Sequence, residues 1–372
     1  MNKIEQLLKE WQSLQPLDEK LERDINQQFM IDFNYNSNHL EGNTLTYGQT
    51  KLLLLFGDTI GNANMQDYEE MKAHNVGLEL MKVEAKDKNR MLSELFIREL
   101  NQTILVRDFY KTSRDGDYRY KIHVGVYKTR PNSVITPSGE IFDYASPEET
   151  PSLMGDLLEW YRNEEKNGTL KVEELAALFH YRYIRIHPFE DGNGRIARLL
   201  VNYIFLRHNY PMLVIRTDDR NNYLKTLHQC DLLTGKIPYN GANATLQQAK
   251  PLVDYISTIL ENKLTALIQL AKGEIPEFVE TKDDTVEKMT DVSVNVSAND
   301  TVNVSVNDTV NDTVNKKIIN LILQMPEINI DKIVVETGKS RSTVIRKIQK
   351  LKTDGIIERA GSDKTGYWKI KG

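Results

Sequence analysis

The architecture of this 372-residue chain follows from one short segment, His187-Pro188-Phe189-Glu190-Asp191-Gly192-Asn193-Gly194-Arg195-Ile196-Ala197-Arg198. Apolar runs at 175–186 and 196–206 flank it, and each run predicts a helix. Gly192 and Gly194 have no Cβ, so the backbone can turn sharply between the helices and approach a ligand closely. Successive backbone N–H groups in such a turn form a nest for an anion, and a following helix adds its dipole. The segment therefore predicts an anion-binding loop at the start of a helix.

Four side chains of this segment suit a phosphate ligand. Arg195 and Arg198 are three residues apart, so a helix places both guanidinium groups on one side, where they can bind phosphate oxygens. Asp191 is a hard oxygen ligand of the kind that holds Mg²⁺ beside a polyphosphate. His187 can accept a proton near neutral pH. The alternative is a plain helix–loop–helix corner with two solvated arginines.

Residues 187–198 match every fixed position of the motif His-x-Phe-x-(Asp/Glu)-Gly-Asn-(Gly/Lys)-Arg-x-x-Arg, so the chain resembles the Fic family. The flanking segments 174–185 and 199–211 also look like Fic core helices. Most Fic proteins are taken to transfer AMP from ATP to a hydroxyl on a target protein. The best-known phosphorylating member has Lys where this chain has Gly194, so the resemblance favours AMP transfer.

The resemblance implies a role for each motif residue. His187 would deprotonate the target hydroxyl, and Asp191 would hold Mg²⁺ on the α- and β-phosphates of ATP. The residues implied in binding the ATP phosphates are Gly192, Asn193, Gly194, Arg195 and Arg198.

A second motif precedes the first by about 150 residues. Gly42 can end the helix expected before it, which would put Glu41 in the last turn, where a carboxylate opposes the helix dipole. Such a broken local rule tends to mark a functional residue. Ser37 to Gly42 resembles the inhibitory motif Ser/Thr-x-x-x-Glu-Gly/Asn of many Fic proteins, in which the glutamate pairs with the second motif arginine, here Arg198. The alternative is an ordinary surface serine and glutamate.

A short hairpin is predicted where the helical pattern stops, within residues 107–150. Turn residues at Pro137, Ser138 and Gly139 follow the strand-like run 134–136. Fic proteins place a β-hairpin flap there, which aligns a segment of the target by strand addition. The flap residues are then Val134, Ile135 and Thr136, and the alternative is a plain surface loop.

The resemblance also implies a nucleoside contact after the motif. In the family a tyrosine at this distance packs beside the adenine, and Tyr223 fits it. The asparagine expected eight residues later is replaced by Asp231, which puts a nucleoside contact at that position in doubt. Both residues are equally compatible with core or surface roles.

Composition restricts the classes of protein that the chain can belong to. The net charge of −5 does not favour a protein that binds nucleic acid along its whole length. Cys230 is the one cysteine, so no intramolecular disulfide forms, and a buried packing role is expected for it. The longest apolar run, 52–56, is far too short to span a bilayer, and no signal-peptide pattern begins the chain. We expect a cytoplasmic protein without membrane contact.

The periodicity predicts a mostly α protein. The resemblances imply a helical Fic core with a β-hairpin flap and a small C-terminal winged helix-turn-helix domain. The expected order is an N-terminal helical region with the inhibitory motif (1–110), a Fic catalytic core (111–275), an acidic low-complexity linker (276–315) and the winged helix (316–372). The linker carries nine acids against two lysines, and Val-Asn-Asp-Thr-Val-Asn repeats near its end.

The last 57 residues reverse the charge, with 13 lysines and arginines against six acids, a net charge of +7. Three helical segments and two strands are predicted, and their order resembles a winged helix-turn-helix domain. The side chains expected to face a DNA groove are Ser342, Thr343, Arg346 and Lys347. Winged helices also bind proteins, which remains the alternative for this segment.

The leading interpretation is a protein adenylyltransferase that uses ATP and Mg²⁺ and is autoinhibited by Glu41. A DNA-binding regulator with a nucleotide-sensing Fic domain, or an enzyme that transfers another phosphorylated group, is the alternative. The candidate partners are an unidentified protein substrate, the chain itself through self-AMPylation, DNA through 316–372, and a second copy in a homodimer.

Overall fold

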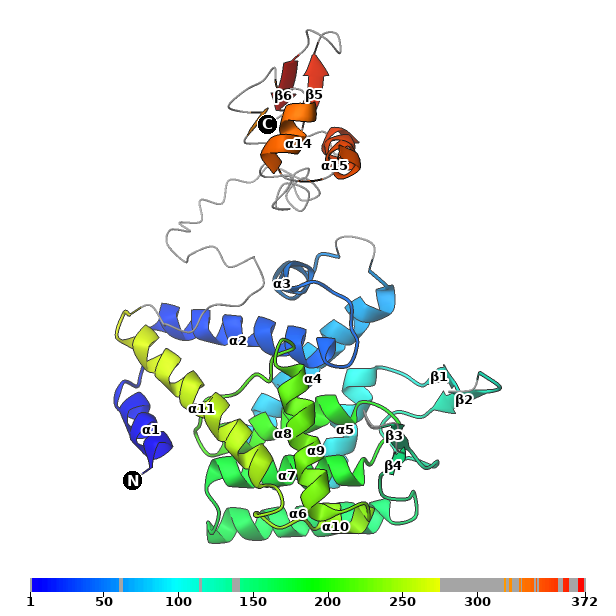
Figure 1. Cartoon of the computed structure of the whole chain (residues 1–372). Coiled ribbons are helices and arrows are strands. Elements are labelled where there is room, and N and C mark those ends of the chain that lie inside the picture. Colours follow the sequence, from blue (N-terminus) through cyan, green and yellow to red (C-terminus); the bar gives the residue numbers. More distant parts are fainter. Residues whose placement is uncertain are drawn as a thin grey trace. The chain divides into compact units, whose positions relative to one another are not determined.

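The structure is a computed structural model that describes residues 2–59, 63–113, 116–135, 141–274, 318, 321–322, 328, 330–337, 339, 341–353, 357–360 and 367–370 (Figure 1). The chain divides into two compact units, Met1–Val286 and Glu287–Gly372. The predicted linker 276–315 lies outside the described residues. The linker and the division of the first unit at residue 110 therefore stay predictions.

The first unit is mostly helical, as the periodicity predicts. Its helices are α1 (Lys3–Ser13), α2 (Glu19–His39), α3 (Tyr47–Phe56), α4 (Met65–Lys86), α5 (Glu94–Leu105), α6 (Thr150–Asn167), α7 (Val172–Ile186), α8 (Asn193–Arg207), α9 (Arg220–Thr234), α10 (Pro238–Ala242) and α11 (Lys250–Ala271). Local capping explains two of the helix starts: Thr46 and Gln49 form a capping box at α3, and Asp18 caps α2.

Helices α7 and α8 form the centre of this unit, and the predicted anion-binding loop joins them (Figure 1). Nearly every side chain of α8 is buried, because α4, α5 and α7 pack around it. Helices α6, α10 and α11 cover α7. The buried side chains of α8 include Arg195, Arg198 and Asn202 as well as its apolar residues. The loop therefore emerges from the buried centre of the unit.

Two antiparallel hairpins lie between α5 and α6. The strands β3 (Ser133–Ile135) and β4 (Ile141–Asp143) pair with Val134 opposite Phe142, which confirms the predicted hairpin; its turn lies outside the described residues. The other hairpin joins β1 (Phe109–Thr112) to β2 (Arg119–Ile122). The sequence did not predict it, because its strands are short, charged and largely exposed.

The second unit is a winged helix-turn-helix region. Helices α14 (Ile330–Thr337) and α15 (Arg341–Thr353) precede the antiparallel strands β5 (Ile357–Ala360) and β6 (Tyr367–Ile370). Ile333, Val344 and Leu351 are buried in its core. Trp368 of β6 packs in the same core, and its indole N–H donates to the carbonyl of Ile328 at 3.0 Å. The described elements confirm the predicted order.

Two further features concern the single cysteine and membrane-spanning helices. Cys230 is a buried free thiol, and burial raises its pKa to about 11, so it acts as a small packing residue. Within the described ranges, no helix has both the length and the apolar character of a membrane span.

Candidate active site

The predicted anion-binding loop is held in shape by its own asparagine. The Asn193 side chain donates to the Phe189 carbonyl at 2.7 Å and accepts from the Phe189 amide at 3.0 Å. Gly192 precedes α8 with φ +82°, a left-handed conformation that favours glycine. The buried Asn193 thus fixes the turn, and the free N–H groups at the start of α8 are those of a nest.

His187 ends α7 in a left-handed conformation, with φ +52°. Its ring stacks on that of Tyr144, just after β4, with centroids 3.9 Å apart and planes 9° from parallel. Burial, helped by the Lys128 ammonium and opposed by the Ile184 backbone and Asp191, lowers the pKa of His187 to about 3. The imidazole is therefore neutral at physiological pH, which is the protonation state of a general base before the reaction.

Arg198 is bound by the residues of the second motif, 157 positions away in sequence. Its guanidinium donates to the Ser37 hydroxyl at 3.0 Å, to the Ser37 carbonyl at 2.8 Å and to a Glu41 carboxylate oxygen at 2.7 Å. The Arg198 side chain is 3% exposed, whereas that of Glu41 is 38% exposed. The structure thus brings the two motifs together, with a buried cation and a partly solvated anion.

Glu41 also lies directly over the start of α8. A Cβ added at Gly194 would collide with the Glu41 carboxylate, so the absent side chain makes room for it. One local expectation was wrong: α2 ends at His39, so Glu41 lies just beyond the helix and not in its last turn. The Glu41 amide bonds back to the Asn38 carbonyl at 3.0 Å, and Gly42 follows with φ +99°.

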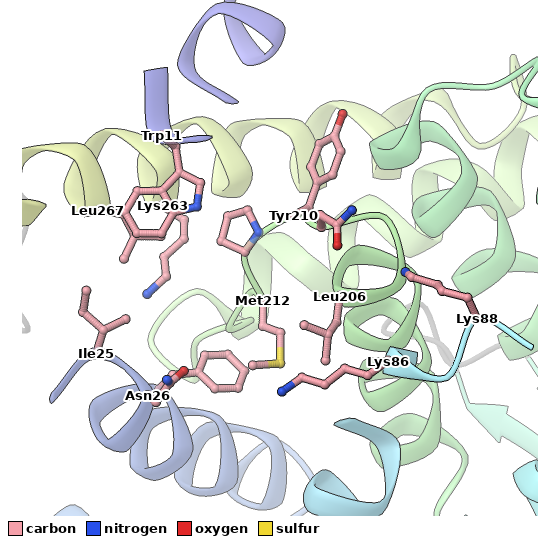
Figure 2. A pocket seen from close by; sticks show the side chains of 13 residues that line it. Trp11, Ile25, Asn26, Lys86, Lys88, Leu206, Tyr210, Met212, Lys263 and Leu267 are labelled. Carbon is pink, nitrogen blue, oxygen red and sulfur yellow. The ribbon is translucent and has the colours of Figure 1, made fainter. Parts of the chain in front are cut away.

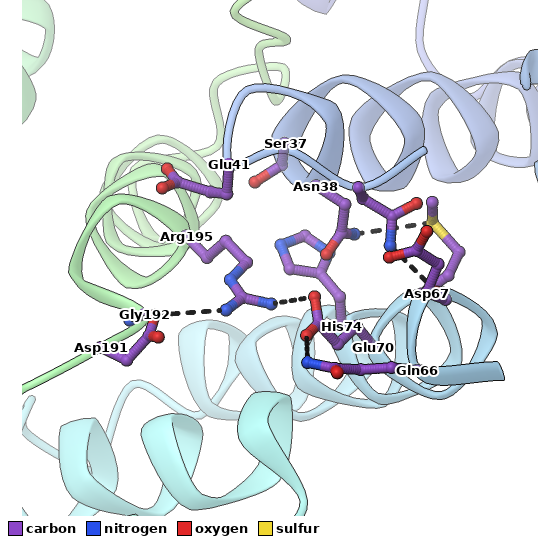
Figure 3. A network of polar contacts seen from close by, with 12 residues as sticks. Ser37, Asn38, Glu41, Gln66, Asp67, Glu70, His74, Asp191, Gly192 and Arg195 are labelled. Atoms are coloured by element: carbon purple, nitrogen blue, oxygen red, sulfur yellow. Dashed lines mark hydrogen bonds and ion pairs between the residues drawn. The ribbon is translucent and has the colours of Figure 1, made fainter. Parts of the chain in front are cut away.

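Arg195 has a different carboxylate partner. Its guanidinium lies 3.2 Å from Glu70 of α4 and 3.6 Å from Asp191, as Figure 3 shows. Asp191 also forms an ion pair with Lys111 of β1. Burial alone would raise the pKa of Asp191, but Lys111 and Arg195 hold it below the usual value. The carboxylate is therefore ionised throughout the neutral range.

Asp191 fits a magnesium ion that arrives with a nucleotide. No cluster of three or more metal-binding side chains occurs in the described part of the chain. Mg²⁺ commonly keeps waters and needs only one or two carboxylates beside substrate phosphates. An ionised carboxylate beside the start of α8 meets that requirement.

Tyr223 and Asp231 both lie on α9, and both are engaged with the protein. The Tyr223 hydroxyl is 2.8 Å from Nε2 of His180, and burial raises the pKa of Tyr223 to about 12. Asp231 accepts from the Tyr181 hydroxyl at 2.8 Å and from the buried Arg185 at 3.2 Å. His180 therefore has a structural role, and a nucleoside contact stays a prediction for Tyr223 and Asp231.

The remaining predicted residues lie on the expected elements. Val134 and Ile135 belong to β3, and Thr136 lies outside the described residues. Ser342, Thr343, Arg346 and Lys347 lie on α15, where Arg346 is exposed.

Sequence reasoning missed four residues that surround the motif. Glu70, Lys111, Lys128 and Tyr144 contact or polarise Arg195, Asp191 and His187 across 43 to 125 positions of sequence. No local pattern marks any of them, because each is an ordinary residue on its own helix, strand or loop.

A helical core, an anion nest at the start of a buried helix, and a neutral histidine beside it define a class of protein built to act on a nucleotide or another phosphate ester. A model of the Fic/DOC family matches residues 91–205, and a model named winged helix-turn-helix DNA-binding matches residues 311–358. A Fic domain containing signaling protein from Bacteroides thetaiotaomicron is 59% identical in sequence to this chain, and its crystal structure matches with a TM-score of 0.70. The match covers 74% of this chain and 99% of that one. The chain belongs to the Fic/DOC family.

Relatives with a named activity are more distant. Protein adenylyltransferase fic-1 of Caenorhabditis elegans is 30% identical over 53% of this chain, and that of Caenorhabditis briggsae is 25% identical over 68%. The chain spans only 36% and 46% of the length of these two relatives. A Fic family protein from Desulfovibrio desulfuricans, 20% identical with a TM-score of 0.50 over 100% of this chain, shares the fold.

Proposed function

We propose that this protein transfers AMP from ATP to the hydroxyl of a Ser, Thr or Tyr residue on a target protein. The observation that carries the proposal is the arrangement of residues 187–198, where a neutral imidazole, a backbone anion nest and two buried arginines meet at the start of α8. The fic-1 relatives are named protein adenylyltransferases, which supports the same reaction.

His187 supplies the base in this proposal. Its imidazole takes the proton of the target hydroxyl, and the oxygen then attacks the α-phosphorus of ATP. The new bond joins that oxygen to AMP, and the bond to the β-phosphate breaks, so pyrophosphate leaves. Because burial keeps His187 neutral, no proton has to leave the imidazole before the reaction begins.

The nest and the arginines supply charge stabilisation. The N–H groups at the start of α8 would bind phosphate oxygens, and Arg195 and Arg198 would neutralise the negative charge that passes to pyrophosphate. Asp191 would hold the Mg²⁺ that accompanies the α- and β-phosphates, which would add further positive charge as the bond breaks. Glu70 and Lys111 hold Arg195 and Asp191 in place before the substrate binds.

We further propose that Glu41 inhibits this reaction. Its carboxylate accepts a hydrogen bond from Arg198 and lies over Gly194. The γ-phosphate of a productively bound ATP would need this position and this arginine. ATP would then bind with a displaced γ-phosphate, and its α-phosphorus would be misaligned with the target hydroxyl. Ser37 is the second acceptor for Arg198 and fixes the direction of its guanidinium.

The target would be aligned by the hairpin β3–β4. Strand addition along β3 would place a target segment close to His187, because Tyr144, which stacks on that imidazole, follows β4 directly. The same alignment would serve self-AMPylation, with a neighbouring copy of the chain as the target.

Labelled ATP tests the reaction directly. The chain is incubated with ATP labelled at the α- or the γ-phosphate, with Mg²⁺, and with a cell extract as the source of targets. The proposal requires protein-bound label from the α-position only. Label from the γ-position would indicate phosphorylation, and an absence of label from both, in the Glu41→Gly variant as well, would leave the Fic domain as a nucleotide sensor.

The second unit favours an additional function, namely DNA binding. It has the described elements of a winged helix-turn-helix region, and α15 carries Arg346 and Lys350 exposed. We propose that α15 contacts DNA through its basic side chains.

A further inference from the structure

A cavity of about 330 Å³ lies in the first unit, away from the predicted active site (Figure 2). Helices α1, α2, α4, α8 and α11 line it, together with the segment 209–212. Figure 2 shows Trp11, Lys263 and Leu267 on one side of it, and Lys86 and Lys88 on the other. Its volume is at the small end of the range of roughly 300–1,000 Å³ for small-molecule sites.

The cavity is cationic. Three of its lining residues are lysines (Lys86, Lys88 and Lys263), and among the described residues that line it none is acidic. Lys88 donates to the carbonyl of Arg207 at the end of α8. Lys86 and Lys263, by contrast, make no ion pair or hydrogen bond with any side chain in the described part of the protein.

Lys263 is the more unusual of these two lysines. It is half-buried on α11, and burial lowers the pKa of its ammonium while Asp32 raises it. The Asp32 carboxylate is already used, since it accepts from the Tyr47 hydroxyl at 2.6 Å and from Gln28 at 2.9 Å. The pKa of Lys263 stays lowered although Asp32 raises it, so a bound anion would offset more of the cost of desolvation.

The rest of the cavity wall is apolar and aromatic. Trp11, Phe29 and Tyr210 line it, and Leu206 and Met212 lie between the two groups of lysines. Flat apolar surfaces beside a cation suit a ligand with a planar hydrocarbon body and a negatively charged end. A free inorganic anion would leave these aromatic faces without contacts.

We propose that this cavity is a second ligand site, which takes a small organic anion with a planar apolar body. The anionic group pairs with Lys263, and the body lies between Trp11 and Phe29. Leu206 is near the last residue of α8, whereas the phosphate nest is at the first, so about 20 Å separates the two sites along this helix. The nucleotide of the active site therefore does not fill the cavity.

Calorimetric titration of the full chain with 2-naphthoate tests the proposal, with the neutral 2-naphthamide as the matched ligand. We expect saturable binding of the acid, and binding at least about tenfold weaker for the amide, because a hydrogen-bonded charge is lost. Lys263→Met should weaken binding of the acid by a similar factor, and Lys86→Met should do so by less, since Lys86 is exposed. Lys20→Met, which removes an exposed lysine of α2 outside the cavity, is the control and should change nothing.

Three results would overturn the inference. The first is no saturable heat with 2-naphthoate at millimolar concentration in a chain that still binds ATP. The second is equal affinity for the acid and the amide, which would indicate that apolar contacts alone bind the ligand. The third is competition of the acid with ATP together with unchanged affinity in Lys263→Met, which would assign the binding to the active site. Thermal unfolding of each variant without ligand separates a lost site from a lost fold.

Discussion

Replacing Glu41 with glycine tests the regulatory contact most directly. The substitution removes the carboxylate that Arg198 holds at 2.7 Å, and it leaves both bonds from Arg198 to Ser37 in place. Glu41 lies beyond the end of α2 at His39, and Gly42 beside it has a left-handed backbone, so a glycine at position 41 does not disturb a helix. We expect AMP transfer, including self-modification, to rise.

The size of the rise follows from burial. A hydrogen bond to a charged group contributes about 1.5–3 kcal/mol, and the 38% exposure of the Glu41 side chain reduces this to about 1–2 kcal/mol. That energy corresponds to about a 5- to 30-fold greater availability of Arg198 for the γ-phosphate. Correct alignment of the α-phosphorus adds to the rate, since an error of about 1 Å costs up to 10²-fold. Thermal unfolding should shift by only a few degrees.

The assay measures protein-bound label from α-labelled ATP in the wild type, Glu41→Gly, Glu41→Gln and Glu41→Gly combined with His187→Ala. Glutamine keeps the size but loses the charge, so its rate should fall between those of the wild type and the glycine variant. The double variant should transfer almost no label, because relief of inhibition does not replace the base His187. An unchanged rate in Glu41→Gly, in a preparation whose label depends on His187, would refute the inhibitory role.

Three further predictions concern the base, the buried imidazoles and the second unit. His187→Ala should lower label transfer by about 10²–10⁴-fold while ATP affinity stays nearly constant in calorimetry, and full activity would exclude His187 as the base. Burial lowers the pKa of His74, His180 and His187, so the unfolded chain binds protons below about pH 6.5 that the folded chain does not. Stability should thus be retained above that pH and fall below it by up to about 1.4 kcal/mol per pH unit for each imidazole; urea midpoints that do not fall between pH 7 and pH 5 would contradict this. The full chain should bind duplex DNA with an affinity that falls steeply with salt, and Arg346→Gln should reduce the salt slope by about one; binding that is independent of salt would favour a protein partner instead.

Local chemistry accounts for what the sequence determined by itself. Residues 187–198 carry the loop, its asparagine and its arginines within twelve positions, so the nest could be predicted from neighbours alone. The capping box of Thr46 and Gln49 and the apolar periodicity placed α3, α7 and α8 for the same reason. The elements of the winged helix-turn-helix region were also recognisable, since each is specified by residues within one or two turns.

Tertiary structure alone decided how the charged groups are paired. The contact between Glu41 and Arg198 was expected from family resemblance, yet only the fold of α2 against α8 puts the carboxylate over Gly194. Glu70 reaches Arg195 across 125 positions. Such pairs depend on which helix faces which, and packing of whole apolar surfaces sets that arrangement, not the charges themselves.

The same reason applies to the stacked ring on His187 and to the lysine cavity. Tyr144 lies 43 positions before His187, and the three lysines come from α4, α11 and the segment after α4. None of them has a spacing that would mark it in the sequence. Their proximity, and the desolvation that lowers the pKa of His187 and of Lys263, arise only when the surrounding helices exclude water from the places where these side chains lie.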